Sequence, residues 1–177
     1  MKVFLRISWN FGKIVVNLCK VINVKIKNMA YKAIDIARKL IFLAQQDEAN
    51  GGECLTNLKL QKLLYYQQGY HLAAFGTPLF DENVESWMYG PVVPTVYDAF
   101  SEFGAHTLPS EEKNPITLAD DEEELFLQVY EAYRDFSAIG LMNKTHQEKP
   151  WLEALPHDKG TVISQKSMEM YFKTQLQ

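Results

Sequence analysis

Apolar side chains recur at three- and four-residue steps in several separate stretches of the chain. The first stretch runs from Tyr31 to Gln46 and contains seven apolar positions with this spacing: Ala33, Ile36, Ala37, Leu40, Ile41, Leu43 and Ala44. Such a period places the apolar side chains on one face of an amphipathic helix. Asn50-Gly51-Gly52 follows, and we expect the helix to end there.

The strongest helical pattern begins after Thr56 and Asn57, either of which can cap a helix N-terminus. The segment Gly76-Thr77-Pro78 closes the pattern with residues that stop helices. We therefore predict a second helix that carries the following apolar positions: Leu60, Leu63, Leu64, Tyr66, Tyr70, Ala73 and Ala74.

Residues 79–94 show no helical period and contain the internal pair Gly90-Pro91. Val84, Trp87 and Tyr89 in this stretch have side chains that favour extended backbone. The pattern predicts a short extended segment and a turn.

The remaining chain predicts four more helices. One follows Pro94 and ends at Gly104, and another runs from Asp120 to Tyr133 with five acidic residues at its favourable N-terminal end. The others run from Ser137 to about His146 and from Ser164, a suitable N-cap, towards the C-terminus, with Pro150-Trp151 breaking the chain between them. The fold class is therefore mainly α: a single compact domain of about six helices, with at most a short strand or hairpin near residues 79–93.

Composition agrees with an ordinary globular domain, since 47% of the 177 residues are apolar and 23% are charged. Cys19 and Cys54 lie far apart, without ligands at metal-binding spacing, so we expect reduced thiols, no metal and no cofactor. The longest charge-free apolar run among the first 30 residues is 14–19, far shorter than the roughly 20 residues of a membrane span. These features predict a cytoplasmic protein with no membrane partner.

Charge is distributed unevenly along the chain. Residues 1–28 hold six of the 18 basic side chains and no acid, which leaves 12 basic against 22 acidic residues, a formal charge of −10, in the remainder. We expect residues 1–28 to be a basic N-terminal extension, either the product of an upstream start codon or an arm with its own role, and 29–177 to be the domain. An acidic body disfavours nucleic acid as a ligand, except through residues 1–28, and favours a basic protein partner.

The strongest candidate for a partner-binding site is the run from Trp87 to Tyr97, in which prolines and a glycine fix the backbone beside three aromatic side chains. Rigid aromatic residues bury area while losing few rotamers, as interface anchors do. The alternative is that Trp87 and Tyr97 are core residues that clamp the turn. The candidate residues are Trp87, Tyr89, Gly90, Pro91, Val92 and Tyr97.

Four further residues have a structural or interface role in this interpretation. His146 precedes Trp151 by five residues, so its ring could bind a loop backbone while the indole fills a gap. Lys59 and Lys62 belong to the one local basic cluster outside residues 1–28, which a solvated helix face would explain. The four histidines have unrelated spacings, and no hydrolase or nucleotide-binding motif is present, so we expect no enzymatic activity and no catalytic residue.

Three motifs in this order resemble the Panacea domain of SocA-like antitoxins and phage-associated GepA-like proteins. They are Leu58-Lys59-Leu60-Gln61-Lys62-Leu63-Leu64-Tyr65-Tyr66-Gln67-Gln68-Gly69, then Pro78-Leu79-Phe80, then Glu85-Ser86-Trp87-Met88-Tyr89-Gly90-Pro91-Val92-Val93-Pro94-Thr95-Val96-Tyr97. Leu141, Thr145-His146, Pro150-Trp151 and a closing helix from Ile163 to Phe172 extend the resemblance over about residues 31–173. One departure is Ser86, where alanine is usual in the family.

The resemblance implies a mainly helical antitoxin that neutralises a toxin encoded by a neighbouring gene through direct contact, in some members as an adaptor for a cytosolic protease. It implies no catalytic residues. The alternative function is that of a prophage-encoded regulator that contacts DNA or host machinery through the basic segment 1–28.

Overall fold

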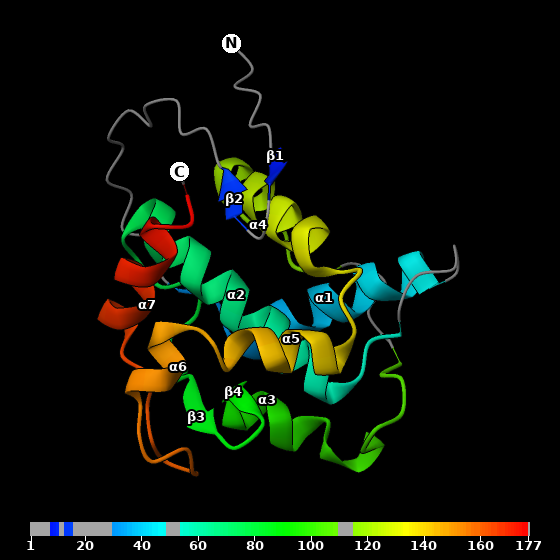
Figure 1. Cartoon of the computed structure of the whole chain (residues 1–177). Coiled ribbons are helices and arrows are strands. Elements are labelled where there is room, and N and C mark those ends of the chain that lie inside the picture. The colour runs from blue at the N-terminus through cyan, green and yellow to red at the C-terminus, as the bar shows by residue number, and fades with distance from the viewer. Residues whose placement is uncertain (1–7, 11–12, 16–29, 49–53, 110–114, 177) are drawn as a thin grey trace.

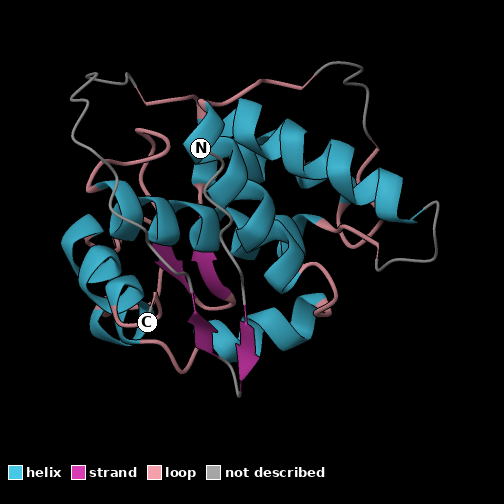
Figure 2. Ribbon diagram, turned by 90° about the horizontal axis from the view of Figure 1, so that it is seen from above, coloured by secondary structure: helices cyan, strands magenta, loops and turns pink. Residues whose placement is uncertain are grey.

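The computed structural model describes residues 8–10, 13–15, 30–48, 54–109 and 115–176. Helices dominate these parts, and the strands form two short antiparallel pairs (Figures 1 and 2). The elements are β1 (Ser8–Asn10), β2 (Lys13–Val15), α1 (Ala33–Glu48), α2 (Asn57–Phe75), β3 (Glu85–Trp87), β4 (Gly90–Val92), α3 (Pro94–Ala99), the 3-10 helix η1 (Ser101–Phe103), α4 (Asp120–Tyr133), α5 (Ala138–Thr145), α6 (Lys149–Glu153) and α7 (Gln165–Lys173). The prediction of a mainly α fold is confirmed, with seven α-helices in the described residues instead of about six.

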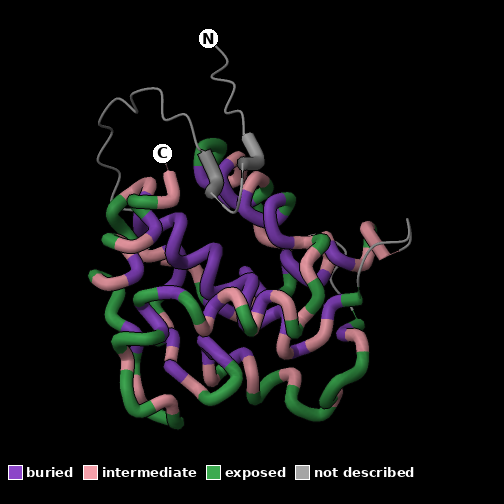
Figure 3. Tube along the Cα trace, viewed as in Figure 1, coloured by how far each residue is buried: buried purple, intermediate pink, exposed green. Residues whose placement is uncertain are grey.

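Helix α2 lies at the centre of the described chain and packs against α1, α4, α5, α7 and the strand β4 (Figure 1). Every residue from Lys59 to Ala73 is buried, and α2 forms the buried middle of the trace in Figure 3. Its aromatic residues meet those of α4 and α7: Tyr66 stacks on Tyr133 with ring centres 3.8 Å apart, and Tyr70 meets Phe172 edge to face at 4.8 Å. The polar residues of α2 are therefore enclosed as well, and each needs a partner.

Helix ends follow the capping signals in the sequence. Thr56 accepts a hydrogen bond from the Lys59 N–H at the start of α2, and Gly76 ends α2 with φ +72°. Ser137 and Ser164 cap α5 and α7 in the same way as Thr56 caps α2. The predicted boundaries of these helices are confirmed.

Two local predictions were wrong. Pro150-Trp151 does not break the chain, because Pro150 occupies the first turn of α6, where its fixed φ suits a helix and its missing N–H is not needed. The predicted single helix after Pro94 is divided at Phe100 into α3 and η1.

Most of the expected basic extension lies outside the described residues. Within 1–28 only 8–10 and 13–15 are described, and they pair as β1 and β2 in the register Ser8 to Val15. The division at residue 28 and a DNA-contacting role for this segment remain predictions. No helix among the described residues combines the length and apolar character that a membrane crossing requires.

Candidate functional site

The hairpin β3–β4 carries most of the candidate binding residues and is joined by the turn Met88-Tyr89. Gly90 follows the turn with φ +91°, a backbone conformation that residues with side chains rarely adopt. A Cβ atom at Gly90 would also lie 2.8 Å from the Thr145 Oγ1 and 2.9 Å from the Lys62 Cε. Only glycine fits here, so the hairpin can lie directly on α2 and α5.

Polar side chains of α2 hold the hairpin in place through its backbone. The Lys62 Nζ donates to the Pro91 carbonyl at 2.9 Å, and the Val93 N–H donates to the Gln61 Oε1 at 2.9 Å. One turn earlier, the Asn57 side chain donates to the Tyr97 carbonyl at 3.0 Å. These contacts connect α2 to the hairpin and to the start of α3. They explain why the buried helix α2 contains the polar residues Asn57, Gln61 and Lys62.

The interpretation of Lys59 and Lys62 as part of a solvated face was wrong. Their exposed fractions are 2% and 0%, and the Lys59 Nζ donates to the Arg134 carbonyl at 2.6 Å. Lys39 on α1 is buried as well and forms an ion pair with Glu123 at 2.7 Å. The long lysine stems lie in the apolar interior, while the amines reach main-chain or carboxylate oxygens.

A groove of about 910 Å³ opens beside the hairpin. Its walls come from α2, the β3–β4 turn, α3 and η1, α5, and the loop before α7. The lining residues are Thr56, Asn57, Leu58, Gln61, Trp87, Met88, Tyr89, Val92, Tyr97, Ser101, Gly104, Ala105, Ala138, Ile139, Met142, His157, Asp158 and Lys159.

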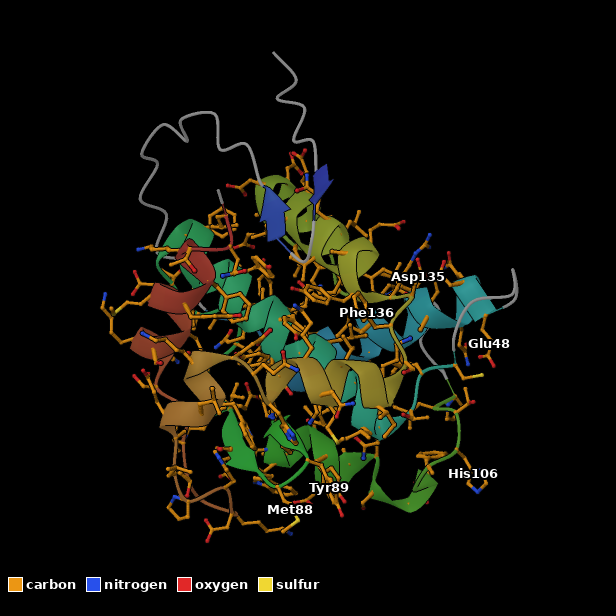
Figure 4. All side chains as sticks on the ribbon, in the orientation of Figure 1. Glu48, Met88, Tyr89, His106, Asp135 and Phe136 are labelled. Atoms are coloured by element: carbon orange, nitrogen blue, oxygen red, sulfur yellow. The ribbon has the colours of Figure 1, made fainter. Side chains whose placement is uncertain are left out.

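Three large apolar side chains of this groove are exposed to solvent. The exposed fractions are 68% for Met88, 64% for Tyr89 and 56% for Ile139. Figure 4 shows Met88 and Tyr89 projecting from the turn at the lower edge of the molecule. Neighbouring apolar groups left in water are typical of surfaces that bind a partner.

Trp87 and Tyr97 form a partly buried aromatic pair in the wall of the groove. Their rings meet edge to face with centres 5.1 Å apart, and the Lys159 Nζ lies 4.7 Å from the centre of the Trp87 ring. The Trp87 Nε1 donates to the Glu85 Oε2, which also accepts the Gly160 N–H, each at 2.8 Å. These rings therefore pack together beside the turn and line the groove, and their role in binding a partner remains a prediction.

Behind the hairpin, His146, Trp151 and His157 form a stack of three rings. The ring centres are 4.1 Å apart for His146 and Trp151 and 3.6 Å apart for Trp151 and His157. The Trp151 Nε1 donates to the Trp87 carbonyl at 3.1 Å, and the Ser86 Oγ lies 2.6 Å from the His157 Nδ1. Histidine spacing along the chain gave no sign of this stack, which forms because the chain folds back after α6 and brings His157 onto the Trp151 indole.

Burial shifts the pKa of three groups next to this stack. It lowers the pKa of Lys62 to about 7 and raises that of Glu148 to about 7. The pKa of His146 is lowered as well, chiefly by burial and then by electrostatic interaction with Lys62. The Glu148 Oε1 accepts a hydrogen bond from the Tyr66 hydroxyl at 3.0 Å, whereas the buried Oε2 has no hydrogen-bond partner among the described residues.

The serine hydroxyl of this cluster is enclosed by the fold. Ser86, the one hydroxyl bound to a histidine in this cluster, has an exposed fraction of 0%, so a substrate cannot reach it. Among the described residues no three or more His, Cys, Asp and Glu side chains are placed to hold a metal ion.

The structure brings most of the sequence-predicted site residues together and divides them by role. Trp87, Tyr89, Val92 and Tyr97 line the groove, whereas Gly90 and Pro91 are buried against α2. Trp151 and Lys62 donate hydrogen bonds to the hairpin backbone, and His146 stacks on Trp151. Lys59 of α2 lies apart from them, with its amine bonded to the Arg134 carbonyl at the end of α4. Sequence reasoning missed these groove residues: Ile139, Met142, His157 and Lys159.

The family model described as "Antitoxin SocA-like, Panacea domain" matches residues 60–152. This span covers more than half of the chain and contains the hairpin, α5 and most of α2. The chain therefore belongs to the Panacea domain family of SocA-like antitoxins.

A curated relative agrees with this assignment. The chain is 48% identical over 50 residues to a protein named Antitoxin SocA from Caulobacter vibrioides (strain NA1000 / CB15N). The aligned stretch covers 28% of this chain and 27% of the relative. No solved structure matches the chain.

Proposed function

We propose that this protein is an antitoxin-like binding protein that neutralises a partner toxin by direct contact at the groove beside the β3–β4 hairpin, without catalysis. The observation that carries the proposal is the position of the groove, whose hairpin and α5 walls fall in the family-matched span 60–152. The toxin would be a basic protein encoded by a neighbouring gene, which suits the formal charge of −10 on residues 29–177.

Physical features of the groove support this role. Met88, Tyr89 and Ile139 present apolar area that a partner would remove from water, at about 25 cal/mol per Å². The rigid pair Trp87 and Tyr97 supplies anchors that lose little conformational freedom on binding. Opposite net charges speed the encounter, and buried aromatic contacts slow release.

Co-expression with the product of the adjacent gene tests the proposal. The wild-type chain should bind that product and restore growth, and Tyr89→Ala should weaken both effects by at least tenfold in affinity. His106→Ala, at another exposed position, is the matched control and should behave as the wild type. A wild-type chain that neither binds nor rescues, or a Tyr89→Ala variant that rescues fully, would overturn the proposal.

Neutralisation by degradation is a finer form of the same proposal. If the chain hands its partner to a cytosolic protease, the partner's half-life in cells should fall when the antitoxin is present. If the chain acts by occlusion alone, the partner should be inactive at an unchanged half-life. A pulse-chase measurement in cells with and without the protease separates the two.

A further inference from the structure

Both edges of the β3–β4 hairpin are already occupied by other parts of the chain. Next to β3, the Ser86 N–H donates to the Thr161 carbonyl at 2.7 Å, and the Ile163 N–H donates to the Val84 carbonyl at 2.8 Å. Next to β4, the side chains of Lys62 and Gln61 take the Pro91 carbonyl and the Val93 N–H. A partner cannot add a strand to this hairpin, so it must dock through side chains.

The groove has the size and chemistry to receive apolar side chains from one face of a helix. Its volume of about 910 Å³ lies at the upper end of the range for ligand sites, and its exposed apolar residues come from two elements, the hairpin turn and α5. Met88 and Tyr89 stand on the first element and Ile139 on the second. A docking helix inserts residues at three- and four-residue steps into this kind of surface.

One acidic residue, Asp158, lines the groove, and two more, Asp98 and Glu102, follow the lining residues Tyr97 and Ser101 in the sequence. All three residues are exposed. Lys159 is the one lysine or arginine in the lining, and its amine already lies over the Trp87 ring. A positive charge beside the apolar face of a ligand would therefore be attracted to these carboxylates.

We propose that the groove binds an amphipathic α-helix of the partner protein, whose apolar face enters the groove and whose flanking lysine or arginine residues meet Asp98, Glu102 and Asp158. This inference rests on the proposed function and specifies the ligand of the same site. It excludes a partner that adds a strand and a partner with an acidic contact face.

A direct test uses two synthetic peptides of about 18 residues, long enough to form a helix. Both peptides have leucine at three- and four-residue steps. The remaining positions are all lysine in one peptide and all glutamate in the other. Fluorescence anisotropy with the full-length chain should show at least tenfold tighter binding of the lysine peptide, weakening as salt rises. Equal affinity for the two peptides, or no binding of the lysine peptide, would overturn the inference.

Matched variants locate the binding. The Met88→Gln/Ile139→Gln double variant should lose at least tenfold in affinity for the lysine peptide. Met170→Gln/Leu127→Gln changes two other exposed apolar side chains, on α7 and α4, and should bind within twofold of the wild type. Equal loss in both double variants would show non-specific adhesion and contradict the inference.

The charge requirement has its own pair of variants. Glu102→Lys should weaken binding of the lysine peptide severalfold, whereas Asp81→Lys, at an exposed position outside the groove lining, should not. Sedimentation of the protein without peptide tests a second copy of this chain as the occupant; a dimer that Met88→Gln/Ile139→Gln dissociates would refute the helix proposal. These assays omit the toxin, so a failed growth rescue with normal peptide binding counts against the proposed function alone.

Discussion

The Lys62 Nζ donates a hydrogen bond to the Pro91 carbonyl oxygen at 2.9 Å, and no part of the Lys62 side chain is exposed. This contact joins the middle of α2 to the hairpin across 29 positions of sequence. A neutral amine still has N–H groups that can donate this bond, and burial favours the neutral form. The pKa of Lys62 is accordingly lowered to about 7.

Lys62→Met should therefore change how stability depends on alkaline pH. In the unfolded chain Lys62 keeps its proton up to about pH 10.5, while in the folded chain it loses the proton near pH 7. The unfolded state binds more protons between these values, so this residue makes stability rise with pH by up to about 1.4 kcal/mol per unit. Urea unfolding at pH 7 to 10 should show a smaller rise in the variant than in the wild type.

Lys32→Met is the matched control, because Lys32 is exposed. It should leave the wild-type slope unchanged. If Lys62→Met and the wild type gain stability at the same rate over this range, Lys62 is charged in the folded protein.

Glu148→Gln should change how stability depends on pH below about pH 7. The folded-state pKa of Glu148 is raised to about 7 from an ordinary value of 4.5, chiefly by burial. The folded state then binds more protons between these values, so stability is present below about pH 4.5 and is lost as pH rises through 7. Glutamine can still accept the bond from the Tyr66 hydroxyl and does not titrate.

Chemical unfolding between pH 4.5 and 7 measures this effect. The wild type should lose up to about 1.4 kcal/mol per pH unit relative to Glu148→Gln over this range. Glu102→Gln, at an exposed position, serves as the control and should follow the wild type. Parallel curves for Glu148→Gln and the wild type would contradict the raised pKa.

Gly69→Ala should destabilise the fold although alanine favours helices. A Cβ atom at residue 69 would lie 2.1 Å from the Phe172 Cε2, so α7 would have to move. Overpacking of this kind costs about 1–3 kcal/mol, more than the roughly 1 kcal/mol that alanine gains over glycine in a helix. Thermal unfolding should show a lower Tm for the variant.

Phe172→Leu in the Gly69→Ala background should recover part of the loss, since the smaller side chain gives up the contested space. A double-mutant cycle should return a favourable coupling energy between the two substitutions. Additive losses would mean that the two residues do not meet as described.

Gln68→Leu should be costly despite its similar size and buried position. The Gln68 Oε1 accepts from the Leu79 and Phe80 N–H groups at 2.8 and 3.2 Å, and its Nε2 donates to the Phe80 carbonyl at 2.9 Å. The substitution leaves these main-chain groups without partners, and each buried unsatisfied group costs about 1–3 kcal/mol. Urea unfolding should show a loss of that order or more, whereas Gln147→Leu at an exposed position should change stability by less than about 0.5 kcal/mol.

Sequence periodicity and caps predicted the helices well because both signals are local. The N-cap residues Thr56, Ser137 and Ser164 each act within one helical turn, so the bounds of α2, α5 and α7 were readable from the chain. The hairpin was also predicted, since its glycine and prolines restrict the backbone wherever they occur.

Long-range partners could not be read in the same way. Lys59 and Lys62 were assigned to solvent because lysine is seldom buried, and their partners Arg134 and Pro91 lie 75 and 29 positions away. His157 carries no local signal of its stacking on Trp151, which depends on how the loop after α6 returns. Ile139 joins the groove only because α5 packs against α2 and β4.

The occupied edges of the hairpin have a consequence for the protein on its own. Free main-chain N–H and C=O groups on a sheet edge can template the growth of fibrous aggregates, and at β3 and β4 those groups are bonded to Thr161, Lys62 and Gln61. The protein can therefore keep the apolar groove open to solvent at high concentration without polymerising through this hairpin.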